Sequence, residues 1–245
     1  MSASEEYLKS CRETLEKLAE TQLPAIGQAA DLIAERVTGG GIVFTFGTGH
    51  SHELAEEVAY RAGGVVPVCP ILEPSLTGST EVSKSEFLER LDGFAPHILD
   101  YHRVGKQDVL VIISNSGRNA VPIEMAVEAQ GRGISVIAVT SLAYSRLVSS
   151  RQRSGKKLYE IADVVIDNCA PHGDAVVKLP GVPQPVGPLS TVAGAAVMHA
   201  MMVGVAERLV GKMDPVPIFW SGNLDGVWEK NHKMMDPYRD RVRFW

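Results

Sequence analysis

The sequence predicts an α/β fold in which a doubly wound parallel sheet carries helices on both faces. Short apolar runs alternate with amphipathic segments, which is typical of consecutive strand–helix–strand units. The runs at 42–46, 108–114 and 134–140 consist mostly of apolar residues, as expected of parallel strands that are covered on both sides. Two of these runs lead directly into small polar loops that precede a helical pattern. A ligand is therefore expected beyond the carboxyl ends of these strands.

The chain divides into three predicted parts. Residues 1–40 form N-terminal helices, because apolar residues recur there at spacings of three and four. Pro24 interrupts this pattern, so a kinked helix and a helical hairpin are both compatible with it. Residues 41–213 form the α/β domain. The tail at 214–245 is rich in aromatic residues, so we expect it to pack on the domain or on a partner subunit.

Further elements follow from local patterns along the domain. The helix that begins at Ser190 is apolar nearly all round and rich in small residues, which indicates a buried helix with Ser190 as its N-cap. The basic run at 141–157 is interpreted as a solvated loop or helix face. The other expected elements are helices at 52–62, 84–92 and 120–132, strands at 65–68 and 162–167, and a hairpin arm at 175–179.

Composition excludes several classes of protein. Apolar residues make up 45% of the 245 residues, which argues against a disordered chain. Charges of both signs are interspersed and sum to −5, which argues against a nucleic-acid partner. No apolar run approaches the roughly 20 residues that span a bilayer, and the N-terminus lacks a signal-peptide pattern. Three widely spaced cysteines form neither a disulfide framework nor a zinc motif. We expect a soluble cytoplasmic protein with no membrane partner and no cofactor.

Two loops at equivalent strand ends form the candidate ligand site. The first loop, at 47–51, consists of Gly47, Thr48, Gly49, His50 and Ser51. The second loop, at 114–119, contains Ser114, Asn115, Ser116, Arg118 and Asn119. Backbone N–H groups and hydroxyls that precede a helix bind anions such as phosphate. Neither loop matches the P-loop or the dinucleotide fingerprint. The alternative is a purely structural role, because ordinary turns and N-caps use the same residues.

These loops and the segment 186–194 carry a resemblance to a known family. Over most of 26–212 the chain resembles sugar isomerase (SIS) domains, the fold shared by glucosamine-6-phosphate synthase, phosphoheptose isomerase, N-acetylmuramic acid 6-phosphate etherase and the glucokinase regulatory protein. The segments 49–52, 60–64, 70–75 and 162–168 more closely resemble an SIS subgroup often labelled phosphoheptose isomerase. The resemblance implies a flavodoxin-like three-layer sandwich and a phosphosugar ligand. It also implies that the first and second loops contact the phosphate through Ser51, Ser114, Ser116 and Asn119. A third loop would close the site with Ser190 and Thr191.

The chain departs from phosphoheptose isomerase in the helix after the first loop. That enzyme carries a His and a Glu four residues apart in this helix, and another His in its late helix. When the chain is aligned on Ser51 and His52, the two helical positions hold Glu57 and Arg61. The metal and base arrangement of that enzyme is therefore not reproduced, and the resemblance does not imply its reaction.

An aldose–ketose isomerisation requires a base near C1 and C2 of the sugar and an acid for its oxygens. Glu57 and Glu81 are the candidate bases, and His52 and His199 are the candidate acids. Three of them also have a structural interpretation. Glu57 is suited to a surface ion pair with Arg61, Glu81 to an exposed position, and a lone histidine in an apolar helix to core packing.

We predict an SIS-fold enzyme that isomerises a phosphorylated sugar or amino sugar. A non-catalytic phosphosugar sensor is one alternative, and a lyase or etherase acting on an N-acetylated sugar phosphate, with Glu81 as base, is another. No metal site is assigned, because His50 and His52 would need a third ligand such as His172. SIS domains usually complete their sites with a second subunit, so a homodimer or homotetramer is expected.

Overall fold

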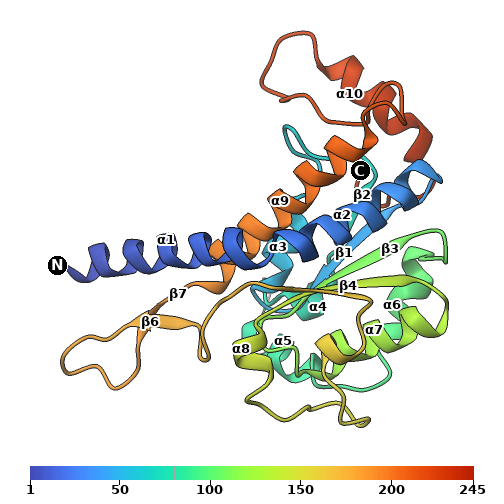
Figure 1. Cartoon of the computed structure of the whole chain (residues 1–245). Helices are drawn as coiled ribbons and strands as arrows, with labels where there is room; N and C mark the ends of the chain where they lie inside the picture. Colours follow the sequence, from blue (N-terminus) through green and yellow to red (C-terminus); the bar gives the residue numbers. More distant parts are fainter. Residues whose placement is uncertain (80) are drawn as a thin grey trace.

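The computed structural model describes residues 1–79 and 81–245, and it contains a five-stranded parallel sheet between two layers of helices (Figure 1). The strand order β2-β1-β3-β4-β5 is that of flavodoxin-like folds and confirms the predicted doubly wound sheet. The strands are β1 (Val43–Gly47), β2 (Val68–Ile71), β3 (Val109–Ile113), β4 (Ser135–Thr140) and β5 (Val164–Asp167).

Both faces of the sheet are buried, and β3 shows this most clearly. Val109, Val111 and Ile113 point into one hydrophobic core, whereas Leu110 and Ile112 point into the other. This arrangement explains why the strands are continuous apolar runs rather than alternating ones. The first core is covered by α2 (Leu23–Thr38), α3 (Ser51–Glu57) and α9 (Ser190–Leu209), and the second by α6 (Ala95–His102) and α7 (Ala120–Gly131).

The N-terminal helices form a kinked arm rather than a hairpin. Helix α1 (Ala3–Thr21) has Gln22 as its C-cap. Pro24 lies in the first turn of α2, where its missing N–H group is tolerated. The two helices run nearly end to end, and α1 extends beyond the sheet alongside an antiparallel hairpin of β6 (Ala175–Val177) and β7 (Val186–Pro188) (Figure 1). The hydroxyl of Tyr7 donates to the carbonyl of Pro188 at 2.8 Å, which holds the hairpin against α1.

Helix α9 corrects one expectation from composition. It is long and apolar enough to cross a membrane by length and composition alone, although no such run was expected. The core helix of a soluble protein meets the same test, and α9 packs here against α1, α2 and α3. Glycines allow this close packing, because a Cβ at Gly204 would lie 3.1 Å from Cβ of Ala30 on α2.

Three predicted elements are displaced in the structure. Helix α3 ends at Glu57 rather than near 62, and Tyr60 beyond it adopts a left-handed backbone with φ of 45°. The second strand begins at Val68, because Val65 instead forms an isolated antiparallel bridge with Ile218 of the tail. The helix expected at 84–92 is shorter and earlier. The short helices are α4 (Pro74–Thr77), α5 (Val82–Leu88), α8 (Leu142–Ser145) and the 3-10 turn η1 (Leu158–Glu160).

The tail contains α10 (Trp228–Met235) and the 3-10 turn η2 (Asp236–Tyr238). Phe219, Met235 and Val242 of this tail belong to the second hydrophobic core. Arg241 Nη2 lies 2.7 Å from both carboxylate oxygens of Asp108, which is fully buried at the start of β3. This ion pair ties the end of the chain to the sheet.

Candidate functional site

The site lies where the chain leaves two neighbouring strands toward opposite faces of the sheet. The first loop follows β1 and leads into α3, which packs in the first core. The second loop follows β3 and leads into α7, which packs in the second core. Strands β1 and β3 are hydrogen-bonded neighbours, so the two loops diverge and leave a crevice at their carboxyl ends. Such a switch point is the usual ligand position in open α/β sheets.

Residues from all three predicted loops line one small polar pocket. The third contribution comes from the first turn of α9. Asn168, which follows β5, also lines the pocket, and its Nδ2 donates to Asn115 Oδ1 at 3.0 Å. Sequence analysis did not select Asn168, although its position directly after a strand was a usable signal. The lining residues are His50, Ser51, Leu54, Ile113, Asn115, Asn168, Ser190 and Thr191.

The second loop is held in a conformation that requires glycine. Gly117 adopts a left-handed backbone with φ of 58°, and an added Cβ would lie 3.0 Å from the hydroxyls of Thr140 and Ser145. The buried Ser114 Oγ accepts a hydrogen bond from the Gly117 N–H at 3.3 Å. Asn119 is the N-cap of α7, but its side chain does not accept from the N–H groups of the first turn. These groups are therefore not capped by the residue that usually does so.

Glu89, which the sequence analysis did not select, joins the first and second loops. One carboxylate oxygen accepts from Thr48 Oγ1 at 2.8 Å, and the other accepts from Asn119 Nδ2 at 2.7 Å. Its backbone carbonyl also accepts from the N–H of Val121 in the first turn of α7, at 3.0 Å. Glu89 follows α5, within the helix predicted at 84–92, and that local pattern carries no signal for these long-range contacts.

The N-terminus of α9 differs from the prediction. Leu189 rather than Ser190 is the N-cap, and its side chain makes no capping hydrogen bond. The carboxylate of Asp174 caps the helix from the β6 side. One oxygen accepts from the N–H groups of Leu189 and Ser190 at 3.0 and 2.7 Å, and the other accepts from Ser190 Oγ at 2.6 Å. The helix end therefore already binds an internal anion, which also takes the hydroxyl of Ser190. Ser190 and Thr191 both line the pocket.

Two of the candidate acid–base residues meet on the first face of the sheet. His199 Nε2 of α9 lies 3.2 Å from Glu57 Oε1 at the end of α3. Arg61 Nη1 also contacts Glu57 Oε1, so the expected surface ion pair is present as well. The side chains of Glu57 and His199 are each 41% exposed, so both remain accessible to a ligand or to a second molecule.

The remaining candidates lie apart from this pair. His52 Nδ1 is hydrogen-bonded with the carbonyl of Gly49, and His50 is exposed. Glu81 is exposed at the start of α5, and its carboxylate accepts from Ser83 Oγ at 3.4 Å. His172 packs edge-on against Tyr144. Across 1–79 and 81–245, the structure contains no group of three His, Cys, Asp or Glu side chains suited to a metal ion.

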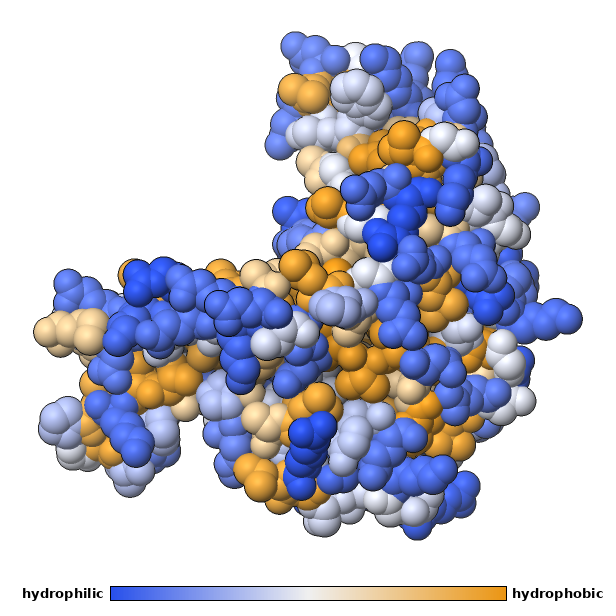
Figure 2. Space-filling model, in the orientation of Figure 1, coloured by the Kyte–Doolittle hydropathy of each residue, from blue (hydrophilic) through white to orange (hydrophobic). Residues whose placement is uncertain are grey.

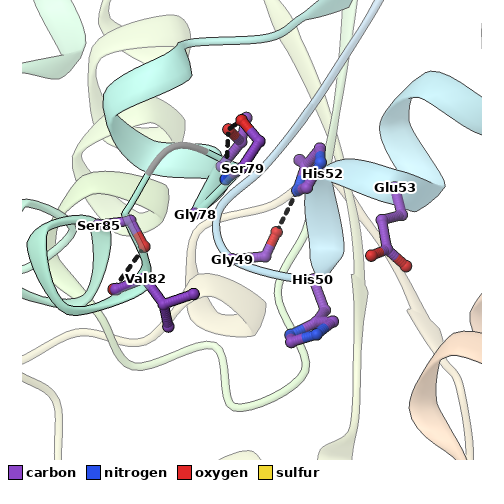
Figure 3. A pocket seen from close by; sticks show the side chains of 9 residues that line it. Gly49, His50, His52, Glu53, Gly78, Ser79, Val82 and Ser85 are labelled. Atoms are coloured by element: carbon purple, nitrogen blue, oxygen red, sulfur yellow. Dashed lines mark hydrogen bonds between the residues drawn. The ribbon is translucent and has the colours of Figure 1, made fainter.

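A second pocket of about 260 Å³ lies on the other side of the first loop (Figure 3). His52 and Glu53 of α3 border it on one side, and Val82 and Ser85 of α5 border it on the other. His50 lines both pockets, so the first loop forms the wall between them.

Comparisons with known proteins place this geometry in a family. A model described as SIS domain matches residues 6–141. A UPF0309 protein of Halalkalibacterium halodurans is 43% identical over 237 residues, which covers 97% of this chain and 98% of the relative. Among solved structures, phosphoheptose isomerase GmhA of Neisseria gonorrhoeae superposes with a TM-score of 0.57 at 21% identity, over 83% of this chain and 97% of that one. The Vibrio vulnificus NanR protein complexed with ManNAc-6P superposes with a TM-score of 0.54 at 16% identity, over 88% and 66%. The two structures share the fold, and the matches in sequence show that the chain belongs to the SIS domain family and to its UPF0309 group.

Proposed function

We propose that this protein binds a phosphorylated sugar between the first and second loops and isomerises it between its aldose and ketose forms. The contact between Glu57 and His199 carries the catalytic part of this proposal, because it unites a base and an acid on the helices that leave the ligand site. Glu57 lies six residues beyond Ser51, or about 9 Å along α3. A sugar phosphate anchored at the loops therefore extends toward this pair.

The loops supply the anion-binding part. Helix α7 begins at the end of the second loop, and its positive dipole end and N–H groups favour a phosphate. Hydroxyls of Ser51, Ser114 and Ser116 stand on the two loops, and Asn115 lines the pocket between them. The similarity in fold to phosphoheptose isomerase and to NanR complexed with ManNAc-6P supports a phosphosugar as the ligand class.

The chemistry requires two proton movements and no oxidant. In the proposed step the carboxylate of Glu57 removes the proton from C2 of the aldose and returns it to C1. The C1 carbonyl becomes a hydroxyl and the C2 hydroxyl becomes a carbonyl, with His199 moving the proton between these oxygens. Arg61 contacts the carboxylate and orients it. The pair takes Glu57 from the helix in which phosphoheptose isomerase carries a His and a Glu, and His199 from α9.

Exchange of the proton that the isomerisation removes, at C2 of an aldose or C1 of a ketose, with solvent tests the proposal directly. The protein is incubated in deuterated water with fructose 6-phosphate, glucosamine 6-phosphate or sedoheptulose 7-phosphate, and deuterium at C1 and C2 is followed by NMR. Wild type should exchange the proton of at least one bound sugar, and Glu57→Gln should slow this exchange by about 100-fold or more. Glu56→Gln, an exposed neighbour on the same helix, is the matched control and should not change the rate. Sugars that bind without exchange in wild type would refute catalysis.

A phosphosugar sensor is the second candidate. It is favoured by the ion pair between Glu57 and Arg61, which engages the proposed base, and by the shared fold with NanR. A sensor should bind the same sugars without exchanging a proton at C1 or C2, so the same NMR experiment separates the two functions.

In this proposal the protein assembles as a homodimer or homotetramer in the cytoplasm. Apolar surface is exposed along the arm that α1 and the β6–β7 hairpin form (Figure 2). Leu8 and Leu23 of the N-terminal helices are 66% and 59% exposed, and Val203 of α9 is 69% exposed. An apolar surface of this kind marks an interface more often than a free face.

A further inference from the structure

We propose that the ligand is a sugar carrying two phosphate groups, and that Arg118 and Arg151 bind the second of them. This inference rests on the proposed phosphosugar site and names its substrate class more narrowly. Arg118 belongs to the second loop, whereas Arg151 belongs to the basic run at 141–157 that the sequence predicts to be a solvated loop or helix face.

Unpaired arginines gather beside the second loop. In the described part of the chain, six of the fourteen arginines have no carboxylate within 4.0 Å of their guanidinium. Four of these six stand on the second loop or on the segment 146–153 that follows α8. They are Arg118, Arg146, Arg151 and Arg153. On a chain whose net charge is −5, this is a local concentration of positive charge.

The segment that carries Arg151 is fixed to the second loop. The N–H of Arg151 donates to the carbonyl of Arg118 at 2.8 Å, and the N–H of Leu158 donates to the carbonyl of Gly117 at 3.0 Å. The guanidinium of Arg151 reaches Asn119 Oδ1 at 2.9 Å. Arg151 therefore stands at the N-cap of α7, next to the proposed phosphate.

In the part of the chain that the structure describes, Arg118 places a second guanidinium without a carboxylate partner at the same loop. Its Nη2 donates to Ser149 Oγ at 3.2 Å, whereas its Nε is buried and has no hydrogen-bond partner among the residues that the structure describes. A guanidinium presents its N–H groups in a planar fork that matches phosphate oxygens, so both arginines are suited to this ligand.

The carboxylates nearby do not neutralise these two guanidiniums. Glu89 accepts from Thr48 and Asn119, which are uncharged, and Glu86 pairs with Arg90. Burial, and after it the positive charges of Arg118 and Arg90, lowers the pKa of Arg151 from its ordinary value despite the opposing effects of Glu89 and Glu86. The local field therefore favours an additional anion.

A single phosphate does not account for this charge. The N–H groups and hydroxyls of the second loop suffice to hold one phosphate group, as they do at other helix N-termini. The guanidinium of Arg151 reaches Asn119 from the adjoining segment, and that of Arg118 points from the loop toward Ser149 on the same segment. A second phosphate on the same sugar provides the anion that they lack.

Isothermal titration with fructose 6-phosphate and fructose 1,6-bisphosphate tests the inference. Wild type should bind the bisphosphate about 10-fold more tightly or better, since each guanidinium–phosphate contact contributes a charge-assisted hydrogen bond. Arg151→Gln should remove this preference, because it should weaken the bisphosphate about 10-fold more than the monophosphate. Arg103→Gln makes the same charge change at the unpaired arginine that follows α6, and it should keep the preference. Inorganic pyrophosphate should bind more weakly than the bisphosphate.

Other results would contradict the inference or the proposed function. Equal affinity of wild type for the two sugars, or an equal loss of both affinities in Arg151→Gln, would show that no second phosphate is recognised. Pyrophosphate that binds as tightly as the bisphosphate would show that the sugar plays no part. If neither sugar binds while the folded protein is intact by circular dichroism, the proposed function itself fails, which is distinguishable from a failure of the preference.

Discussion

The ion pair between Arg241 and Asp108 makes a quantitative prediction about how the tail stabilises the sheet. Asp108 is fully buried, and Arg241 is 30% exposed. In Arg241→Met the carboxylate keeps the N–H groups of Ile42 and Gly105, at 2.9 and 2.8 Å, but loses both contacts to the guanidinium. Breaking a buried pair costs about 3–5 kcal/mol. The partial exposure of Arg241 and the two remaining donors reduce this, so we expect a loss of about 2–3 kcal/mol.

Urea unfolding with linear extrapolation measures this loss. The matched control is Arg239→Met in the same tail, because Arg239 pairs at 2.8 Å with the exposed Asp236. An exposed pair of this kind contributes about 1 kcal/mol or less. If the two variants lose equal free energies of unfolding, the buried carboxylate does not depend on Arg241 and the reasoning fails.

Three further outcomes are expected. Burial, and after it the positive charge of Arg243, lowers the pKa of His102. The folded state therefore favours the neutral imidazole, and this contribution to stability is fully present above about pH 6.5, the ordinary pKa of histidine. It is lost as the pH falls below that value, because the unfolded chain then binds a proton more readily than the folded one. Between pH 7 and 5.5 the free energy of unfolding should therefore fall less in His102→Gln than in wild type. The exposed His97→Gln should behave like wild type, and equal pH dependence of the free energy of unfolding in all three proteins would contradict this. Gly187→Ala places a methyl group 2.7 Å from the ring of Tyr7 and should cost more free energy of unfolding than Gly181→Ala, where the backbone is equally left-handed but the space is open. Light scattering should show an oligomer at all micromolar concentrations, and a concentration-independent monomer would contradict the proposed assembly.

The sheet could be predicted from the sequence because its signals are local. The runs at 42–46, 108–114 and 134–140 are apolar on both faces of each strand, and the loops after the first two contain the glycines that their turns require. The displaced second strand shows where this fails. The apolar residues from Val65 to Ile71 are interrupted by Pro67 and Pro70 and carry no periodicity that fixes the start of a strand. Strand β2 does not include Val65, because Val65 pairs with Ile218 in the tail instead.

The candidate site was only partly predictable, because its contacts join residues that are distant in sequence. Ser190 has the composition of an N-cap, yet the carboxylate of Asp174 caps this helix from sixteen residues away. Glu89 reaches Asn119 from thirty residues away, and Arg151 reaches it from thirty-two on the other side. A propensity describes what a residue does with its own backbone neighbours, whereas these three side chains are placed by the packing of whole elements.

Helix α3 connects the ligand loops to the proposed proton-transfer pair. Ser51 is its first residue and Glu57 its last, and Leu54 between them packs directly on Gly194 of α9. Even a methyl group at Gly194 would overlap the side chain of Leu54, so glycine allows the two helices to approach. His199 lies five residues farther along α9, where it contacts Glu57. The first loop and the Glu57–His199 pair are thus built on one packed pair of helices. A phosphate that orders the first loop consequently acts on the base through a rigid element. This coupling suits an enzyme and a sensor equally well, and proton exchange at C1 or C2 of the bound sugar distinguishes them.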